Sequence, residues 1–199
     1  MIGIIDYGLG NIKAFYNLYK EININLKIID NYKYINKNIN KLILPGVGAF
    51  DEVITKLKEK NFFDEIKNFS INKENKILGI CSGMQILGVN SEEGKKKGLG
   101  LIDGDIFKIK NAFTPHMGWN SVIIKRRDLI LNNINHDNYF YFLHSYHFKE
   151  KLEKNVIGVS KYQNVFSSII KNENIYGVQF HPEKSHKSGL QLLKNFSEI

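Results

Sequence analysis

The chain has 199 residues, of which 43% are hydrophobic and 24% are charged, a balance typical of a compact domain that buries a core. Its formal net charge is +8, but the lysines are scattered among isoleucine and asparagine residues, so the charge predicts neither a nucleic-acid nor a membrane partner. A single cysteine excludes an internal disulfide and favours a reducing cytoplasm.

Strand and helix signals alternate through the first half of the chain. Short apolar runs predict strands over 2–6, 25–30, 41–45 and 76–80. Helical spacing follows over 11–20, where Asn11 can cap the helix, over 51–69, with a break near Asn61, and over 84–89. This alternation predicts an α/β fold with a mostly parallel central sheet and helices on both faces.

The second half is richer in strand signals. β-Branched and aromatic residues predict strands over 100–110, 120–125, 138–145 and 156–162. The segment 166–180 predicts a hairpin that turns near 172–174, and a closing helix is expected over 187–196. We therefore expect extra antiparallel strands in the second half of a single domain, 1–199.

The only cysteine, Cys81, lies at the centre of the stretch GICSG (79–83), between a predicted strand and a predicted helix. G-x-C-x-G is the cysteine form of the nucleophile elbow, a tight turn that needs glycines around a strained nucleophile. The following helix would direct its amide groups and the positive end of its dipole at the sulfur, which favours the reactive thiolate. The motif alone is equally compatible with a buried structural cysteine.

A nucleophilic thiol needs a base, and His181 directly follows another apolar strand in YGVQFHPEKS (176–185). Glu183 lies two residues further on, and side chains at i and i+2 share a face in extended chain. The carboxylate can therefore orient the imidazole, as the third member of a catalytic triad does. The alternative use of these residue types, a metal site, lacks clustered ligand spacing, so no metal is expected.

The loop in LPGVGAF (44–50) ends a third predicted strand with two glycines around Val47. Such a loop can present backbone N–H groups to a developing oxyanion. A plain Pro-Gly turn is the alternative interpretation.

Together these stretches resemble a known family. The chain is similar to class I, triad-type glutamine amidotransferases, and more narrowly to the glutaminase subunit of imidazole glycerol phosphate synthase. The resemblance rests on segments in the expected order from residue 1 to 199, namely IDYGLGN, LPGVGAF, GICSGMQ, SEEG, PHMGWN, YFLHSY and QFHPEKS. It implies the flavodoxin-like fold of that family, a Cys81–His181–Glu183 triad and no cofactor.

The resemblance also implies roles for further residues. Backbone amides of Val47, Gly48 and Ser82 would hold the oxyanion. Contacts to the substrate glutamine would come from Gly48, Gln85, Glu93, Ser145 and Tyr146. Asn11 and Trp119 would lie near the interface with the synthase and the ammonia exit; a core role is the alternative for Trp119, and its match to the motif argues against it. His144 is expected to be structural or to support the site from behind.

The resemblance further implies a partner, a (β/α)₈-barrel cyclase that forms a heterodimer with this chain and receives its ammonia. One departure is Ser82, which stands where leucine is usual. This leaves open a relative that supplies ammonia to a sugar amidotransferase of bacterial surface-glycan biosynthesis. A catalytically silent binding or regulatory subunit is the alternative from another class, and the intact triad argues against it.

Overall fold

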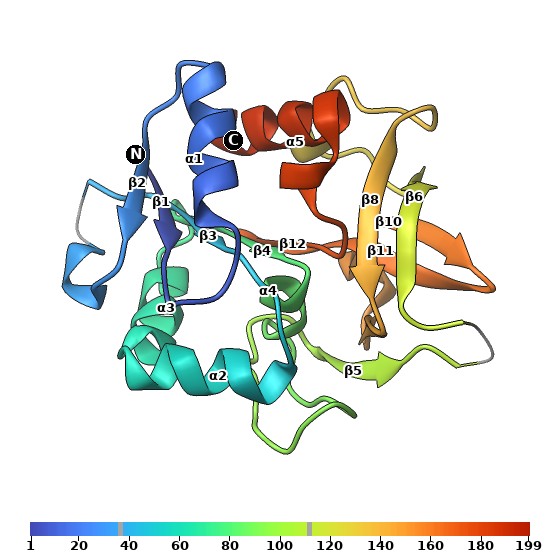
Figure 1. Cartoon of the computed structure of the whole chain (residues 1–199), viewed down its shortest axis with the longest axis horizontal. Helices are drawn as coiled ribbons and strands as arrows, with labels where there is room; N and C mark the ends of the chain where they lie inside the picture. Colours follow the sequence, from blue (N-terminus) through green and yellow to red (C-terminus); the bar gives the residue numbers. More distant parts are fainter. Residues whose placement is uncertain (36–37, 111–112) are drawn as a thin grey trace.

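A computed structural model of the chain describes residues 1–35, 38–110 and 113–199. Its centre is an eight-stranded sheet with the strand order β2-β1-β3-β4-β12-β11-β10-β7 (Figure 1). The strands are β1 (Ile2–Ile5), β2 (Leu26–Ile29), β3 (Lys41–Leu44), β4 (Lys76–Ile80), β7 (Ile123–Ile124), β10 (Val156–Tyr162), β11 (Asn164–Asn172) and β12 (Ile175–Val178). From β2 to β12 neighbouring strands are parallel, and from β12 to β7 they are antiparallel. The predicted mixed α/β sheet is confirmed.

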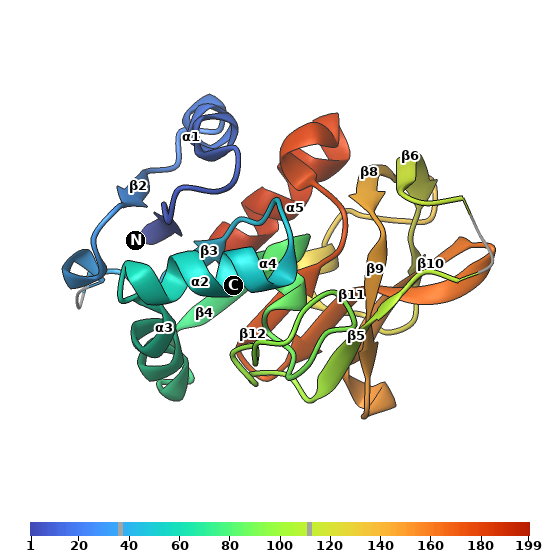
Figure 2. The same cartoon turned by 60° about the horizontal axis from the view of Figure 1, so that its bottom comes forward.

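Helices cover both faces of this sheet, as the continuous burial of the central strands β1, β4 and β12 requires. Helices α1 (Ile12–Glu21) and α5 (His186–Glu198) lie on one face, and α2 (Phe50–Glu59) and α3 (Phe62–Ile71) on the other (Figures 1 and 2). The sheet thereby separates two apolar cores. In β3, Ile43 belongs to the core under α1 and α5, whereas Leu42 and Leu44 belong to the core under α2 and α3. The predicted break at Asn61 is confirmed, because this residue takes a left-handed conformation with φ of 58° between α2 and α3.

Two antiparallel ribbons lie beside the sheet (Figure 2). Strand β5 (Gly104–Lys108) pairs with β9 (Tyr146–Glu150), and β6 (His116–Ser121) pairs with β8 (Tyr139–His144). Single-turn 3₁₀ helices complete the elements: η1 (Tyr32–Tyr34), η2 (Leu129–Leu131), η3 (Glu153–Asn155) and η4 (Pro182–Lys184). Among the described residues, no helix is long and apolar enough to cross a membrane.

Three sequence-based boundaries differ from the structure. The expected strand 120–125 is divided in the structure: it covers the end of β6, which begins already at His116 and pairs with β8, and the short strand β7 (Ile123–Ile124). The strand β9 was not expected, because the chain changes partner at Ser145 and starts a new strand against β5. The expected helix 84–89 is wrong: α4 covers only Ser82–Gln85, since the chain then turns and Val89 N–H donates to the carbonyl of Gly104.

Candidate active site

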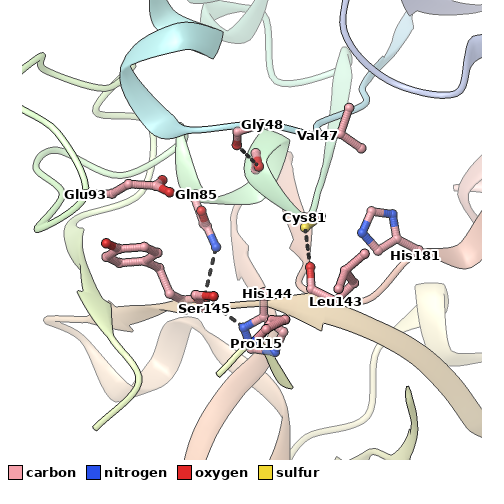
Figure 3. A pocket seen from close by; sticks show the side chains of 12 residues that line it. Val47, Gly48, Cys81, Gln85, Glu93, Pro115, Leu143, His144, Ser145 and His181 are labelled. Atoms are coloured by element: carbon pink, nitrogen blue, oxygen red, sulfur yellow. Dashed lines mark hydrogen bonds between the residues drawn. The ribbon is translucent and has the colours of Figure 1, made fainter. Parts of the chain in front are cut away.

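The site is built at the carboxyl ends of β3, β4 and β12, which are neighbours in the sheet and run parallel. Because parallel strands end at the same edge, the loop after β3, Cys81 after β4 and His181 after β12 meet there. A cavity of about 260 Å³ lies between them (Figure 3). Its lining includes every predicted oxyanion and substrate residue: Val47, Gly48, Ser82, Gln85, Glu93, Ser145 and Tyr146.

The turn at Cys81 has the strained geometry of a nucleophile elbow. Cys81 has φ of 53° and ψ of −113°, a region that residues with a Cβ rarely occupy. The backbones of the neighbouring strands and the loop touch here. A Cβ on Gly79 would lie 2.4 Å from the carbonyl oxygen of Gly83, and one on Gly46 would lie 2.1 Å from the amide nitrogen of Gly83. The glycines therefore permit the close approach that holds the thiol at the strand tip.

Besides His181, the sulfur of Cys81 contacts one hydrogen-bond acceptor and one donor. The side chain is 5% exposed, and the thiol donates to the carbonyl oxygen of Leu143 at 3.7 Å (Figure 3). The carboxamide nitrogen of Gln179 donates to the same sulfur at 3.7 Å. The sulfur therefore has an acceptor for its proton as a thiol and a donor that suits it as a thiolate.

His181 stands beside this sulfur and is held from behind by Glu183. Its Nδ1 lies 2.8 Å from Oε1 of Glu183, and both side chains are buried. The expected contact between His181 and Glu183, two residues apart, is therefore present. The backbone that makes it is not extended chain as expected, because Glu183 belongs to the 3₁₀ turn η4. Burial opposes protonation of the imidazole, yet hydrogen bonds with Cys81 and Glu183 and the charges of both raise its pKa to about 10.

The loop after β3 is exposed and is tied to the elbow by one side chain. Val47 and Gly48 are exposed, and Gly48 has φ of 101°, which glycine adopts without strain. The hydroxyl of Ser82 donates to the carbonyl oxygen of Gly48 at 2.8 Å. The residue that departs from the family pattern thus contacts the loop that is expected to hold the oxyanion.

Glu93 is fixed at the opposite wall by the start of α2. Its Oε2 accepts from the backbone N–H of Phe50 at 2.8 Å, and the Asp51 carboxylate accepts from the backbone N–H groups of Lys95 and Lys96. Burial raises the pKa of Glu93, while the Phe50 amide acts in the opposite direction. The result is a partly buried carboxylate in a fixed position, suited to a ligand with a positive charge.

The remaining predicted substrate residues line the cavity in different ways. Ser145 stands between β8 and β9, and its carbonyl accepts from Ile109 N–H. Gln85 is 4% exposed, and its amide nitrogen donates to the carbonyl of Tyr146 at 3.0 Å and to Oε1 of Gln179 at 3.2 Å. Gln85 is therefore bonded to the protein through its nitrogen.

Two buried histidines support the cavity wall, and the sequence singled out only His144. His116 Nδ1 lies 3.0 Å from His144 Nε2, and His144 Nδ1 lies 2.8 Å from the Tyr146 carbonyl. Since that carbonyl only accepts, His144 carries its proton on Nδ1 and His116 donates to its Nε2. Burial lowers the pKa of His116 to about 4 and that of His144 to about 3, so both remain neutral.

The two predicted interface residues lie apart from the thiol. Trp119 on β6 is 48% exposed and is therefore not a core residue; its ring stacks on His186 at 5.1 Å between centroids. It lines a second cavity, of about 640 Å³, with Tyr139 and with Leu18 of α1. Asn11 caps α1 by accepting from Ala14 N–H at 3.3 Å, and it lines neither cavity.

Sequence reasoning missed Gln179, His116 and Leu143. Gln179 could have been found, because it lies two residues before His181 in the stretch that follows β12, and side chains at i and i+2 share a face in extended chain. The Leu143 carbonyl leaves no sequence signal. In the part of the chain that the structure describes, no group of three or more His, Cys, Asp or Glu residues is arranged to hold a metal ion.

Comparison with known proteins gives consistent matches over the whole chain. The family profile described as "Glutamine amidotransferase class-I" matches residues 3–199. The protein named imidazole glycerol phosphate synthase subunit HisH from Leptospira borgpetersenii is 44% identical, with 100% of both chains covered. Subunit HisH 2 of the same synthase from Methanococcus maripaludis is also 44% identical, with 98% of both chains covered.

Solved structures show the same fold at much lower sequence identity. A crystal structure titled as a glutamine amidotransferase has a TM-score of 0.78 at 15% identity and covers 99% of this chain and 97% of its own. The structure titled PurLQS from Thermotoga maritima has a TM-score of 0.75 at 17% identity, with coverage of 99% and 97%.

Proposed function

The chain belongs to the class-I glutamine amidotransferase family and, within it, to the HisH subunits of imidazole glycerol phosphate synthase; from this premise we propose that it is the glutaminase of that synthase. The reaction is glutamine plus water to glutamate plus ammonia, and the ammonia serves histidine biosynthesis. The observation that carries the proposal is the single cavity into which Cys81 and His181 both open, with Glu183 behind the imidazole.

The first half of the reaction uses the thiolate of Cys81. It attacks the carboxamide carbon of glutamine, and the carbonyl oxygen becomes an oxyanion. Backbone N–H groups of Val47, Gly48 and Ser82 are proposed to receive that charge, since these three residues line the cavity together with Cys81. The C–N bond then breaks, a thioester forms, and the nitrogen leaves as ammonia after it takes a proton.

That proton comes from His181. Its raised pKa keeps the imidazole protonated at neutral pH, beside the thiolate, so it is ready to act as the general acid. Once it has lost the proton, the neutral imidazole accepts one from water, and the hydroxide attacks the thioester. Glu183 holds Nδ1 at 2.8 Å and thereby keeps Nε2 directed towards the reaction.

The opposite wall is proposed to bind the amino-acid end of glutamine. Glu93 supplies a partly buried carboxylate for the ammonium group. Gly48, Gln85, Ser145 and Tyr146 are proposed to complete this pocket. A small cavity of about 260 Å³ suits a ligand smaller than the drug-sized molecules that fill about 300–1,000 Å³.

The relatives' names describe one subunit of a synthase, so this chain functions with a partner subunit. We propose that the partner is a (β/α)₈-barrel cyclase in a heterodimer, that the complex is cytoplasmic, and that the face with Trp119 and Asn11 meets it. The exposed Trp119 and the cavity beside it support this assignment. Ammonia must reach the cyclase unprotonated, which favours a dry passage over release into water.

Ammonia production from glutamine by the chain, alone and with the cyclase and its nucleotide ligand, tests the proposal. We expect weak activity alone and a large increase in the complex. Cys81→Ala should abolish glutamine hydrolysis, with a loss on the order of 10⁴-fold or more. Its complex should still make product from an added ammonium salt. Activation by a sugar-modifying synthase instead of the cyclase would reassign the partner, and no adduct of Cys81 with a glutamine analogue in the complex would indicate a silent subunit.

A further inference from the structure

The side chain of Gln179 is fully buried and contacts the reacting atom of the proposed glutaminase. It stands between the end of β12 and His181, with 0% exposure. Its Nε2 donates to Cys81 Sγ at 3.7 Å, and its Oε1 accepts from Gln85 at 3.2 Å. We propose that Gln179 is a further catalytic residue, which stabilises the thiolate of Cys81 through a neutral N–H donor. The proposal rests on the glutaminase function given above.

The hydrogen-bond partners of Gln85 and Gln179 determine which atom of the Gln179 amide faces the sulfur. The carbonyl oxygen of Tyr146 can only accept, so the Gln85 atom facing it at 3.0 Å is the nitrogen. The second hydrogen of that nitrogen points at Gln179 and requires an acceptor, which is Oε1. Nε2 of Gln179 is therefore left facing the sulfur, and Gln85 acts as the residue that positions it.

Besides His181, two uncharged groups contact the sulfur, and they favour different protonation states. The Leu143 carbonyl accepts the S–H of the thiol and offers nothing to a thiolate. The N–H of Gln179 stabilises the negative sulfur, and because the amide is neutral it does not compete with His181 for the proton. The same N–H serves deacylation: when the C–S bond breaks, the electron pair returns to the sulfur, where this donor is already in place.

Alkylation of the full chain by iodoacetamide tests the proposal directly, because Cys81 is the only thiol and only the thiolate reacts. Gln179→Met keeps the shape of the side chain and removes the donor. We expect the pH of half-maximal alkylation rate to rise by about one unit, which is about tenfold less thiolate at a fixed lower pH. Gln179→Glu should raise it further, since a carboxylate repels the thiolate.

Two further variants keep the result interpretable. Gln163→Glu makes the same amide-to-carboxylate change at an exposed turn and should leave the alkylation profile unchanged. Gln85→Met frees the Gln179 amide from its positioning contact, so it should raise the same pH value, and the Gln85→Met/Gln179→Met double variant should shift it no further than Gln179→Met alone. If Gln179→Met fails to fold, as judged by circular dichroism, Gln85→Met carries the test.

The outcome separates this proposal from the glutaminase function itself. An active wild-type complex, together with an unchanged alkylation profile in Gln179→Met and Gln85→Met, would overturn the role of Gln179 and leave the function intact. An inactive wild-type complex would overturn the function, while the alkylation profiles would still decide what Gln179 does to the sulfur.

Discussion

The hydroxyl of Ser82 donates to the carbonyl oxygen of Gly48 at 2.8 Å, and so connects the residue after the nucleophile to the exposed loop in front of it. The leucine that the resemblance to the family led us to expect at this position has no donor for such a bond. The bond restrains a loop whose backbone amides are proposed to receive the oxyanion. Preorganised donors are effective because they need not be ordered during the reaction.

We therefore expect Ser82→Ala to lower kcat/KM for glutamine about two- to tenfold, as loss of one hydrogen bond worth about 0.5–1.5 kcal/mol implies. Ser82→Thr keeps the hydroxyl and should restore most of the activity. Ser197→Ala removes a comparable hydroxyl-to-carbonyl bond from α5, far along the chain from the loop, and serves as the control. Wild-type kinetics in Ser82→Ala would show that the bond does not restrain the loop.

Glu183→Gln should narrow the pH range of activity from the alkaline side. The carboxylate is one of the groups that raise the pKa of His181 to about 10, so its neutral replacement lowers that pKa. The imidazole then loses its proton at a lower pH than in the wild type, and without that proton it can no longer act as the general acid. Measured as a pH profile of kcat in the complex, the alkaline limb should move to lower pH. An alkaline limb at the wild-type position would contradict this role.

Glu93→Gln should weaken glutamine binding more than it slows chemistry. The amide oxygen can still accept from Phe50 N–H, so the start of α2 stays capped, but the charge that is proposed to hold the substrate ammonium is lost. We expect KM to rise about tenfold or more, as for loss of a charged hydrogen bond worth about 1.5–3 kcal/mol, with kcat changed little. Steady-state kinetics give both values. A fall in kcat at constant KM would show that Glu93 does not bind the substrate ammonium group.

The buried pair His116 and His144 should make the fold sensitive to acid. Burial lowers the pKa of each in the folded state, so unfolding takes up protons once the pH is below the ordinary histidine value of 6.5. Their contribution to stability is present above pH 6.5 and is lost as the pH falls towards about 4. Each histidine adds up to about 1.4 kcal/mol per pH unit to the slope.

Urea unfolding between pH 7 and pH 4 measures this slope, and His116→Phe is the informative variant. Phenylalanine can take the place of the imidazole between Phe142 and Tyr162, whose ring centroids lie 4.9 and 4.1 Å from it. The free energy of unfolding of the variant should fall less steeply with acid than that of the wild type. Equal slopes would exclude His116 as a source of acid sensitivity.

The parallel half of the sheet was predictable from sequence because each of its strands is a short, mostly apolar run bounded by polar residues, glycine or proline. The same pattern identified Cys81 and His181 as candidates, since each directly follows such a run in the sequence. The second half was less predictable. Strand β6 contains His116, Gly118 and Asn120, and only its partner β8 gives it strand geometry.

Features built from main-chain atoms also left no trace in the sequence. The carbonyls of Leu143 and Tyr146 meet the site because β8 and β9 pair with different strands on either side of Ser145. The contact of Ser82 with Gly48 needed the folded loop. Glu183 was predictable as the partner of His181, although the 3₁₀ turn that places it was not.

The pairing of β4 with β12 aligns Gly79 with Gly177 and Ile80 with Val178, so this alignment sets where thiol and imidazole stand relative to each other. Slippage by a single position would send His181 to the far side of the sheet. Insertions and deletions can therefore be accommodated only outside the aligned strands. The hairpin turn at Asn174 is no such place, because the buried Asn174 side chain donates to the carbonyls of Ser70, Asn72 and Asn75. The exposed turn at Gln163, between β10 and β11, is one. Among descendants of this gene, the length of the chain between that turn and His181 should stay constant while the turn itself varies.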